Sequence, residues 1–317
     1  MPTTNDRRDA LLKLRDRNAK QDYVPAGFFL HFDKSCHTGQ AAVDKHTEFF
    51  RFTEMDFVKI QLELSFPKIA VEKPADWAKL HFLDKGFFEA ELQVVEGLVQ
   101  ALGKEALILV TLYSPLMMAN HIGDADLLNR HLEDNVDAVA AGMQTMTDSL
   151  IGFVRECVKI GVDGFYHSTQ GGEDNRFANP DAFEQGVKPY DLEVMREIER
   201  TCRFNILHIC DYNRALYGGY SDLTRFFDYP GHVVNCALEG MNPDLVSAMF
   251  HRPFMGGMER LGLLATGTES EVRTAARSAL SEASEQFILG ADCTVPADTP
   301  WGNLRAAIEE AHRWNSR

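Results

Sequence analysis

The stretch ALILVTLY (residues 106–113) decides the fold class. It is a short apolar run rich in branched and aromatic residues, as expected of a strand that is buried on both faces. A long helical pattern, DLLNRHLEDNVDAVAAGMQTMTDSLIGFVRECVKIG, follows it and leads into a second such run, GVDGFYHS (161–168). The order of strand, helix and strand is typical of a parallel sheet with crossover helices, so the sequence predicts an α/β protein.

The same alternation extends along the chain and gives eight candidate strands. The other six are VPAGFFLHF (24–32), DFVKIQ (56–61), FNILHIC (204–210), HVVNCALE (232–239), RPFMGGME (252–259) and QFILGADC (286–293). Eight strands alternating with helices favour a closed (β/α)8 TIM barrel. The alternative, an open doubly wound sheet, would want a glycine-rich phosphate turn, and FDKSCHTGQ after the first run contains no G-x-G-x-x-G.

Composition and charge narrow the class of protein. The chain has 317 residues, of which 45% are hydrophobic and 25% charged, which is ordinary for a globular protein. No low-complexity segment or Pro/Gly/Ser linker divides it, so we expect a single barrel domain over residues 1–317 with an N-terminal helical extension. The formal charge of -15 and the lack of a basic stripe argue against nucleic acid as a partner.

Cysteine usage and the distribution of apolar residues indicate the compartment. The six cysteines are widely scattered, unlike the dense disulfide framework of a small secreted domain, and are expected to be reduced thiols. No apolar run reaches the ~18 residues of a membrane span. The charged N-terminus, MPTTNDRRDALLKLRDRNAK, lacks the apolar core of a signal peptide. We therefore expect a cytoplasmic protein that does not associate with membranes.

Polar residues gather at the carboxyl ends of the predicted strands, where the active sites of TIM barrels lie. They are His31 and Asp33, Gln61 and Glu63, Tyr113, His167, Ser168 and Gln170, His208, Cys210 and Asp211, Glu239, Met258 and Glu259, and Cys293. The interior parts of the same strands are apolar. Loop polarity explains some of this bias, but a purely structural barrel would not need it.

Four of these residues form a candidate metal site. His208 and Cys210 are two residues apart and share one face of a strand, Glu239 ends the next strand, and Cys293 ends the last one. Zinc favours imidazole and thiolate ligands, and a carboxylate is a weak fourth ligand that a substrate thiol could displace. Two thiolates make a soft site that suits activation of a thiol. The spacing alone leaves open that these are ordinary core side chains, because a buried cysteine usually behaves as a small hydrophobe.

Longer motifs resemble those of a known family. FILGADCTVPADTPWGNLRAAIEEAHRW (287–314) resembles the end of the uroporphyrinogen decarboxylase superfamily, and within it the zinc-dependent, corrinoid-linked methyltransferases, which carry G-x-x-C-x-x-P-x-x-T-P. ILHIC (206–210) resembles the H-x-C strand of that branch. TEFFRFTEMDFVKIQ (47–61), VTLYSPLMMA (110–119) and GVDGFYHSTQ (161–170) resemble its earlier segments. The resemblance extends from about residue 8 to residue 314.

The resemblance implies a (β/α)8 barrel with zinc at its mouth, bound by His208, Cys210 and Cys293. Glu239 resembles the glutamate of cobalamin-independent methionine synthase, a related barrel. The implied reaction moves a methyl group from a methyl-corrinoid on a partner protein to a zinc-bound thiol.

Candidates for catalytic or substrate-binding roles are His31, His167, Gln170 and Asp211. His31 could bind a substrate anion or carry a proton, and a structural, hydrogen-bonded histidine is the alternative.

Two departures from the family pattern bear on function. The decarboxylases carry paired arginines in the loop after the first strand, and LHFDKSCHTGQ has none. Lys34 is a poor substitute for a guanidinium fork that clamps carboxylates. The methyltransferase branch usually has glycine after its H-x-C, where this chain has Asp211, which leaves room for an amine or sulfonium substrate.

Two other functions stay open at this point. One is a metal-free decarboxylase or lyase on the same scaffold, and the other is a non-catalytic barrel that docks a corrinoid protein.

Overall fold

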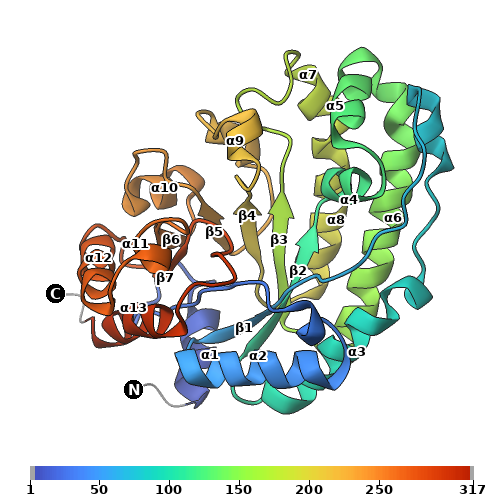
Figure 1. Cartoon of the computed structure of the whole chain (residues 1–317). Helices are drawn as coiled ribbons and strands as arrows, with labels where there is room; N and C mark the ends of the chain where they lie inside the picture. The colour runs from blue at the N-terminus through green and yellow to red at the C-terminus, as the bar shows by residue number, and fades with distance from the viewer. Residues whose placement is uncertain (1–3, 315–317) are drawn as a thin grey trace.

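The computed structural model describes residues 4–314, which form an α/β architecture built on a seven-stranded parallel sheet (Figure 1). The strands pair in chain order and are β1 (Phe57–Ile60), β2 (Leu107–Tyr113), β3 (Gly164–Thr169), β4 (Ile206–Ile209), β5 (Val233–Cys236), β6 (Phe254–Met258) and β7 (Phe287–Ala291). Each crossover contains helix, as the alternation of the sequence predicts. This order is consistent with a TIM-like barrel.

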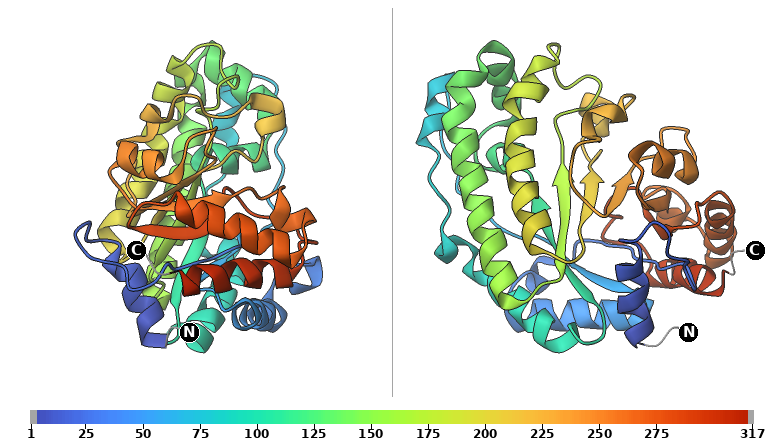
Figure 2. Two further views of the ribbon diagram at one scale, coloured as in Figure 1. Left: turned by 90° about the vertical axis from the view of Figure 1, so that its left-hand side faces the viewer. Right: turned by 180° about the vertical axis from the view of Figure 1, so that it is seen from behind.

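Helices cover the outside of the sheet (Figure 2). The larger ones are α2 (Gly39–Thr53), α3 (Lys85–Leu102), α4 (Pro115–Ile122), α5 (Ala125–Asp134), α6 (Val136–Ile160), α8 (Lys188–Thr201), α10 (Pro243–Phe250), α12 (Glu269–Ser281) and α13 (Trp301–Arg313). Short helices are α7 (Asp181–Gly186), α9 (Arg214–Tyr217), α11 (Leu263–Thr266), η1 (Lys34–Cys36), η2 (Pro74–Lys79) and η3 (Leu223–Phe226). The N-terminal helical extension is confirmed as α1 (Thr4–Lys13).

The long helical pattern between β2 and β3 is two helices rather than one. Asn135 separates α5 from α6, and its side chain accepts a hydrogen bond from the backbone N–H of Ala138. Asparagine is a preferred N-cap because its oxygen satisfies an otherwise unpaired N–H of the first turn. Helix α6 ends at Gly161, whose φ of 107° suits glycine.

The first predicted strand, residues 24–32, is not a regular strand in this structure. Only two isolated parallel bridges connect it to the chain around β7, Ala26 with Leu289 and Leu30 with Val295. On its other side, Ala26 O accepts a hydrogen bond from Asp56 N. Pro25 has no N–H to donate, and glycine at position 27 weakens a strand, so this run cannot form a continuous ladder. The eighth strand of the predicted barrel is therefore replaced by an extended segment between β7 and β1.

Register places the carboxyl ends of the central strands side by side. Ser168 on β3 is paired with His208 on β4, and His208 is paired with Asn235 on β5. Within each strand nearly all residues are buried, because the sheet is covered on one face by helices and fills its own interior on the other. Among the described residues, no helix is both long and apolar enough to cross a membrane. The single-domain organisation over residues 1–317 stays a prediction.

Candidate metal centre and its two cavities

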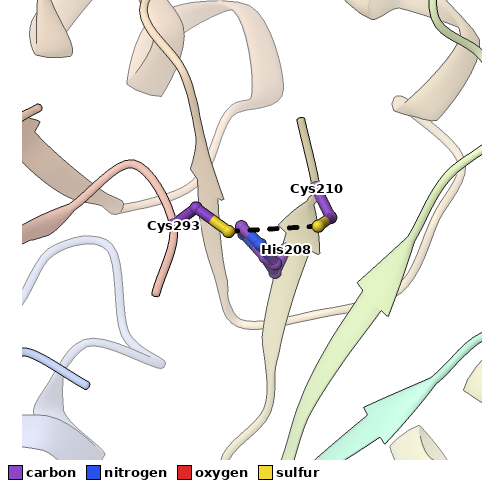
Figure 3. A group of neighbouring side chains, drawn as sticks. All are labelled: His208, Cys210 and Cys293. Carbon is purple, nitrogen blue, oxygen red and sulfur yellow. Dashed lines mark hydrogen bonds between the residues drawn. The ribbon is translucent and has the colours of Figure 1, made fainter. Parts of the chain in front are cut away.

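Three of the four predicted ligands meet at the carboxyl end of the sheet. One donor atom from each of His208, Cys210 and Cys293 lies within 4.8 Å of the other two, and all three residues are buried (Figure 3). His208 lies on β4, Cys210 follows that strand, and Cys293 follows β7. The two sulfur atoms are 4.0 Å apart and do not form a disulfide.

Local backbone geometry explains why these side chains converge. Cys210 N donates to Thr169 O, so the pairing of β4 with β3 continues past the assigned end of β4. His208 and Cys210 consequently project from the same face. On the other side, one carboxylate oxygen of Asp292 accepts hydrogen bonds from Arg260 N and Cys293 N, which fixes the turn that presents Cys293.

The donor set fits zinc. A tetrahedral ion with metal–sulfur bonds of about 2.3 Å places two thiolate ligands about 3.8 Å apart, close to the separation seen here. The pKa of Cys210 is held well below its usual range, first by a hydrogen bond from the Cys293 thiol and also by nearby His208. His208 Nδ1 has no hydrogen-bond partner among the described residues. Two thiols and an imidazole, already close together, leave a fourth tetrahedral position for an exogenous ligand.

Glu239, the fourth predicted ligand, is not brought to the cluster. Its carboxylate forms a two-pronged ion pair with Arg214 of α9, with Arg214 Nη2 at 2.7 Å from Oε2 and Nη1 on Oε1. The residue follows β5 with a φ of 49°, in the left-handed region. A carboxylate engaged by a guanidinium fork is satisfied where it is. This geometry gives the prediction of Glu239 as a ligand no support.

The three donors open onto a cavity of about 360 Å³. Its lining includes aromatic and amide side chains from the segment 24–32, from β1 to β4 and from the loops and helix that follow these strands: His31, Gln61, Tyr113, His121, Tyr166, Gln170, Tyr212 and Asn213. Tyr166 packs on His208 with ring centroids 4.8 Å apart, and its hydroxyl donates to Asn235 on β5. The cavity can hold a small molecule beside the sulfur atoms.

Lys59 of β1 also lines this cavity, and the sequence analysis missed it. The residue is only 5% exposed. A lysine within the apolar run DFVKIQ was the available signal, because lysine is almost never fully buried without a partner.

Gln170 is positioned by a buried ion pair. Arg176 and Glu173 have fully buried side chains and pair through two hydrogen bonds of 2.5 and 2.6 Å. Arg176 Nη2 and Asn213 Nδ2 both donate to Gln170 Oε1, at 3.4 and 3.3 Å. Since both neighbours are donors, the Gln170 amide must direct Nε2 away from them, and Nε2 donates to Cys210 Sγ at 3.5 Å.

His31 and His167, two other predicted catalytic residues, lie in different environments. His31 lies at the cavity, with Nδ1 2.6 Å from Glu63 Oε1. His167 is buried on the opposite face of β3 from Tyr166 and Ser168 and is not among the residues that line the cavity. Both of its ring nitrogens lack hydrogen-bond partners among the described residues, and burial lowers its pKa to about 3. The structure does not bring His167 to the cluster.

Asp211 lines a second cavity, of about 580 Å³, next to the first. This cavity also contains Glu239, Arg214, Arg260 and Asp292. Asp211 is buried, its Oδ1 has no hydrogen-bond partner among the described residues, and its other oxygen lies 3.6 Å from Arg214 Nη1. Asp211 therefore faces charged groups on the far side of Cys210 rather than the cavity of the sulfur atoms.

Comparison with known proteins shows the family and the fold of the chain. The sequence profile of the uroporphyrinogen decarboxylase (URO-D) family matches residues 53–314. A methylcobamide:CoM methyltransferase, MtbA, of Methanosarcina mazei is 24% identical over 250 residues, covering 75% of this chain and 68% of its own. The fold is similar to that of a solved methyltransferase from Methanosarcina mazei, with a TM-score of 0.77, 13% identity and 99% of each chain covered. It is also similar to a B12-independent methionine synthase from Shewanella, with a TM-score of 0.54, 12% identity, and 92% and 95% coverage.

Proposed function

Because the chain belongs to the uroporphyrinogen decarboxylase (URO-D) family, we propose that it is a zinc-dependent methyltransferase that moves a methyl group from a methyl-corrinoid protein to a thiol. The observation that carries this proposal is the convergence of His208, Cys210 and Cys293 in one buried cluster that opens onto a cavity. The similarity to the methylcobamide:CoM methyltransferase supports the same reaction class.

The residues of the chain have distinct parts in this proposal. His208, Cys210 and Cys293 would hold zinc, which when bound lowers the pKa of a coordinated thiol and keeps it as the nucleophilic thiolate. Gln170 donates to the Cys210 sulfur and holds that ligand in place. The His31 ring, fixed by Glu63, stands at the cavity where it can bind or orient the substrate.

The runner-up, a decarboxylase acting on a tetrapyrrole, is favoured by the family but not by the cavity. A tetrapyrrole with many carboxylates needs several cationic side chains around it. Among the described residues that line the 360 Å³ cavity, Lys59 is the one lysine or arginine. A small thiol matches this space and charge better.

The proposed corrinoid partner requires a docking surface near the cluster. Leu261, which lines the second cavity, is 63% exposed, and Leu216 of α9, the helix that begins with the cavity residue Arg214, is 72% exposed. Tyr212, 61% exposed, belongs to the lining of the first cavity and packs under the Arg260 guanidinium, 5.2 Å from ring centroid to Cζ. Apolar side chains gathered at a functional opening are typical of a protein interaction site.

The test combines metal analysis with methyl transfer. We expect about one zinc per chain by elemental analysis of protein purified without chelator, and transfer of the methyl group of methylcobalamin to a small thiol, measured by the change in corrinoid absorption. Prolonged dialysis against a chelator should abolish transfer, and added zinc should restore it. Protein that contains no zinc and decarboxylates an acid substrate in chelator would instead establish the runner-up.

A further inference from the structure

Lys59 is a cation placed inside the cavity of the sulfur atoms. It belongs to β1, and its alternation partners Phe57 and Gln61 point to the same interior face. Nζ donates one hydrogen bond, of 2.9 Å, to Gln61 Oε1. It also stands over two aromatic rings, 4.8 Å from the centroid of Phe29 and 4.6 Å from that of Tyr166.

This setting fixes the ammonium group without neutralising it. Gln61 offers a neutral amide oxygen, and Gln61 itself is held by Leu30 O and Thr111 Oγ1. The two rings offer only their quadrupoles, which attract a cation but carry no net charge. No salt bridge to Lys59 is formed among the described residues, so its positive charge has no carboxylate partner in direct contact.

The charge on the sulfur cluster changes during the proposed reaction. Two thiolates and a neutral imidazole exactly compensate a divalent zinc ion in formal charge, and a bound substrate thiolate adds one negative charge. Formation of the carbon–sulfur bond to that thiolate, while the electron pair of the broken bond stays with the methyl donor, gives a neutral thioether. A buried charge is costly unless an opposite charge lies nearby, so the two bound states differ in their need for a cation.

We propose that Lys59 supplies the positive charge that balances the substrate thiolate, so that the cavity holds the thiol substrate and releases the uncharged thioether product. This inference rests on the proposed function and assigns to Lys59 a charge-balancing part in substrate binding. It also explains why the ammonium is oriented by neutral groups, since a carboxylate in contact would cancel the charge before the substrate arrives.

The protonation state agrees with this part. Burial lowers the pKa of Lys59 from its ordinary value of 10.5 to about 8. The amine is thus mostly protonated at neutral pH.

Binding measurements on the zinc-loaded protein test the proposal directly. The variants are Lys59→Met, which keeps the length of the side chain, Lys59→Arg, which keeps the charge, and the exposed Lys85→Met as a matched control. The probes are 2-mercaptoethanol, its S-methyl thioether, and 3-mercaptopropionate, with dissociation constants from calorimetry. Cobalt(II) substitution adds a second readout, the sulfur-to-cobalt charge-transfer band that appears when the thiolate binds.

For Lys59→Met we expect unchanged zinc content, affinity for 2-mercaptoethanol weaker by on the order of a hundredfold, and unchanged affinity for the thioether. Lys59→Arg should retain most of the thiol affinity, and Lys85→Met should match the wild type. The charge-transfer band of Lys59→Met should saturate only at correspondingly higher thiol concentration.

Three results would overturn the inference while leaving the proposed function intact. Thiol and thioether affinities that fall together would mean that Lys59 only shapes the cavity. A loss confined to 3-mercaptopropionate would mean that it binds an anionic tail instead of balancing the sulfur. Unchanged thiol affinity in a folded variant would mean that it has no part in binding.

If Lys59→Met fails to fold, Lys59→Gln provides the same comparison. A wild-type protein that binds no zinc would refute the proposed function itself.

Discussion

The buried carboxylates at the amino end of the sheet have more hydrogen-bond partners than the buried polar groups at its carboxyl end. At the amino end, Asp163 before β3 accepts hydrogen bonds from Arg8 and from Ile108 N, and Asp56 before β1 accepts from Tyr23, Ala26 N and His312. At the carboxyl end, several buried polar atoms lack a protein partner, among them His208 Nδ1 and Asp211 Oδ1 within the described residues. Carboxylates that accept several hydrogen bonds stabilise the fold at the amino end, whereas unpaired nitrogen and oxygen atoms at the carboxyl end can receive a ligand.

The largest expected effect is at the carboxyl end. Cys293→Ser removes one of the two sulfur ligands, and we expect loss of bound zinc and a drop in methyl transfer on the order of a thousandfold. The free energy of unfolding of the metal-free protein should stay nearly unchanged, which urea denaturation can measure. Cys36→Ser, a half-buried cysteine away from the cluster, is the matched control. A variant that keeps its zinc would contradict the ligand assignment.

The corresponding change at the amino end should affect stability and leave metal binding alone. Asp163→Ala deprives Arg8 of its bidentate partner and leaves Ile108 N unsatisfied. We expect a loss of about 3 kcal/mol in the free energy of unfolding. Zinc content per folded chain should equal that of the wild type. If zinc affinity fell as well, the two ends would be coupled and the comparison would no longer hold.

His167 should make the free energy of unfolding depend on pH. Its pKa is lowered from 6.5 to about 3 by burial, so the folded state holds it neutral. The unfolded chain binds a proton as the pH falls below 6.5, and the folded chain does not, so stability should fall with decreasing pH. Between about pH 7 and pH 5 this amounts to about 2 kcal/mol.

His167→Leu should flatten that slope and keep methyl transfer, with the exposed His81→Leu as control; denaturation at each pH measures it. Lost transfer in a folded His167→Leu protein would revive the catalytic prediction for this residue.

Gln170 is expected to have a smaller effect at the carboxyl end. Gln170→Leu removes the N–H donor to the Cys210 sulfur, and loss of such an outer partner typically weakens metal affinity about tenfold. Competition with a chromogenic chelator measures the change. The surface substitution Gln93→Leu should have no effect, because within residues 4–314 the recorded hydrogen bond of its amide goes to Glu89 on the outside of α3. Equal zinc affinity in both variants would mean that the hydrogen bond to sulfur is incidental.

Glu239 should have the smallest effect. Its ion pair with Arg214 is about half exposed on the arginine side, and such pairs contribute little to stability. Glu239→Gln should therefore keep full zinc content, with zinc affinity within about twofold of wild type, because among the described residues its carboxylate bonds to Arg214 and to none of the three ligands. Zinc loss comparable to that of Cys293→Ser would restore Glu239 as a fourth ligand.

Much of this architecture could be predicted from the sequence because each buried strand appears as a short apolar run of neighbouring residues. Seven of the eight predicted strands are present, and three of the four predicted ligands meet. The predicted strand 24–32 forms only isolated bridges, because Pro25 lacks an N–H and Gly27 weakens a ladder even within an apolar run. Strand alternation puts His167 and Gln170 on opposite faces, and the structure accordingly brings Gln170, but not His167, to the cluster.

The placement of Glu239 could not be predicted in this way. The ion pair with Arg214 joins the loop after β5 to α9 and depends on how two loops fold against each other. No local pattern specifies such a pairing. Lys59 is the intermediate case, since its position in an apolar strand was visible but its function depends on side chains from β3 and from residue 29.

The irregular segment 24–32 is a weakly hydrogen-bonded seam between β7 and β1. Two isolated bridges and a few backbone hydrogen bonds join this segment to the chain around β7 and to Asp56. Strands β3 and β4, in contrast, are hydrogen-bonded to a neighbouring strand along both edges. The free energy of local opening is lower where a segment has fewer backbone hydrogen bonds to its neighbours. We therefore expect local opening of the sheet to occur mainly at this segment. His31 stands at the end of this segment, while His208 lies on a strand held on both edges. Widening of the cavity for passage of a substrate can thus proceed at the seam while the strand that carries the imidazole donor stays still.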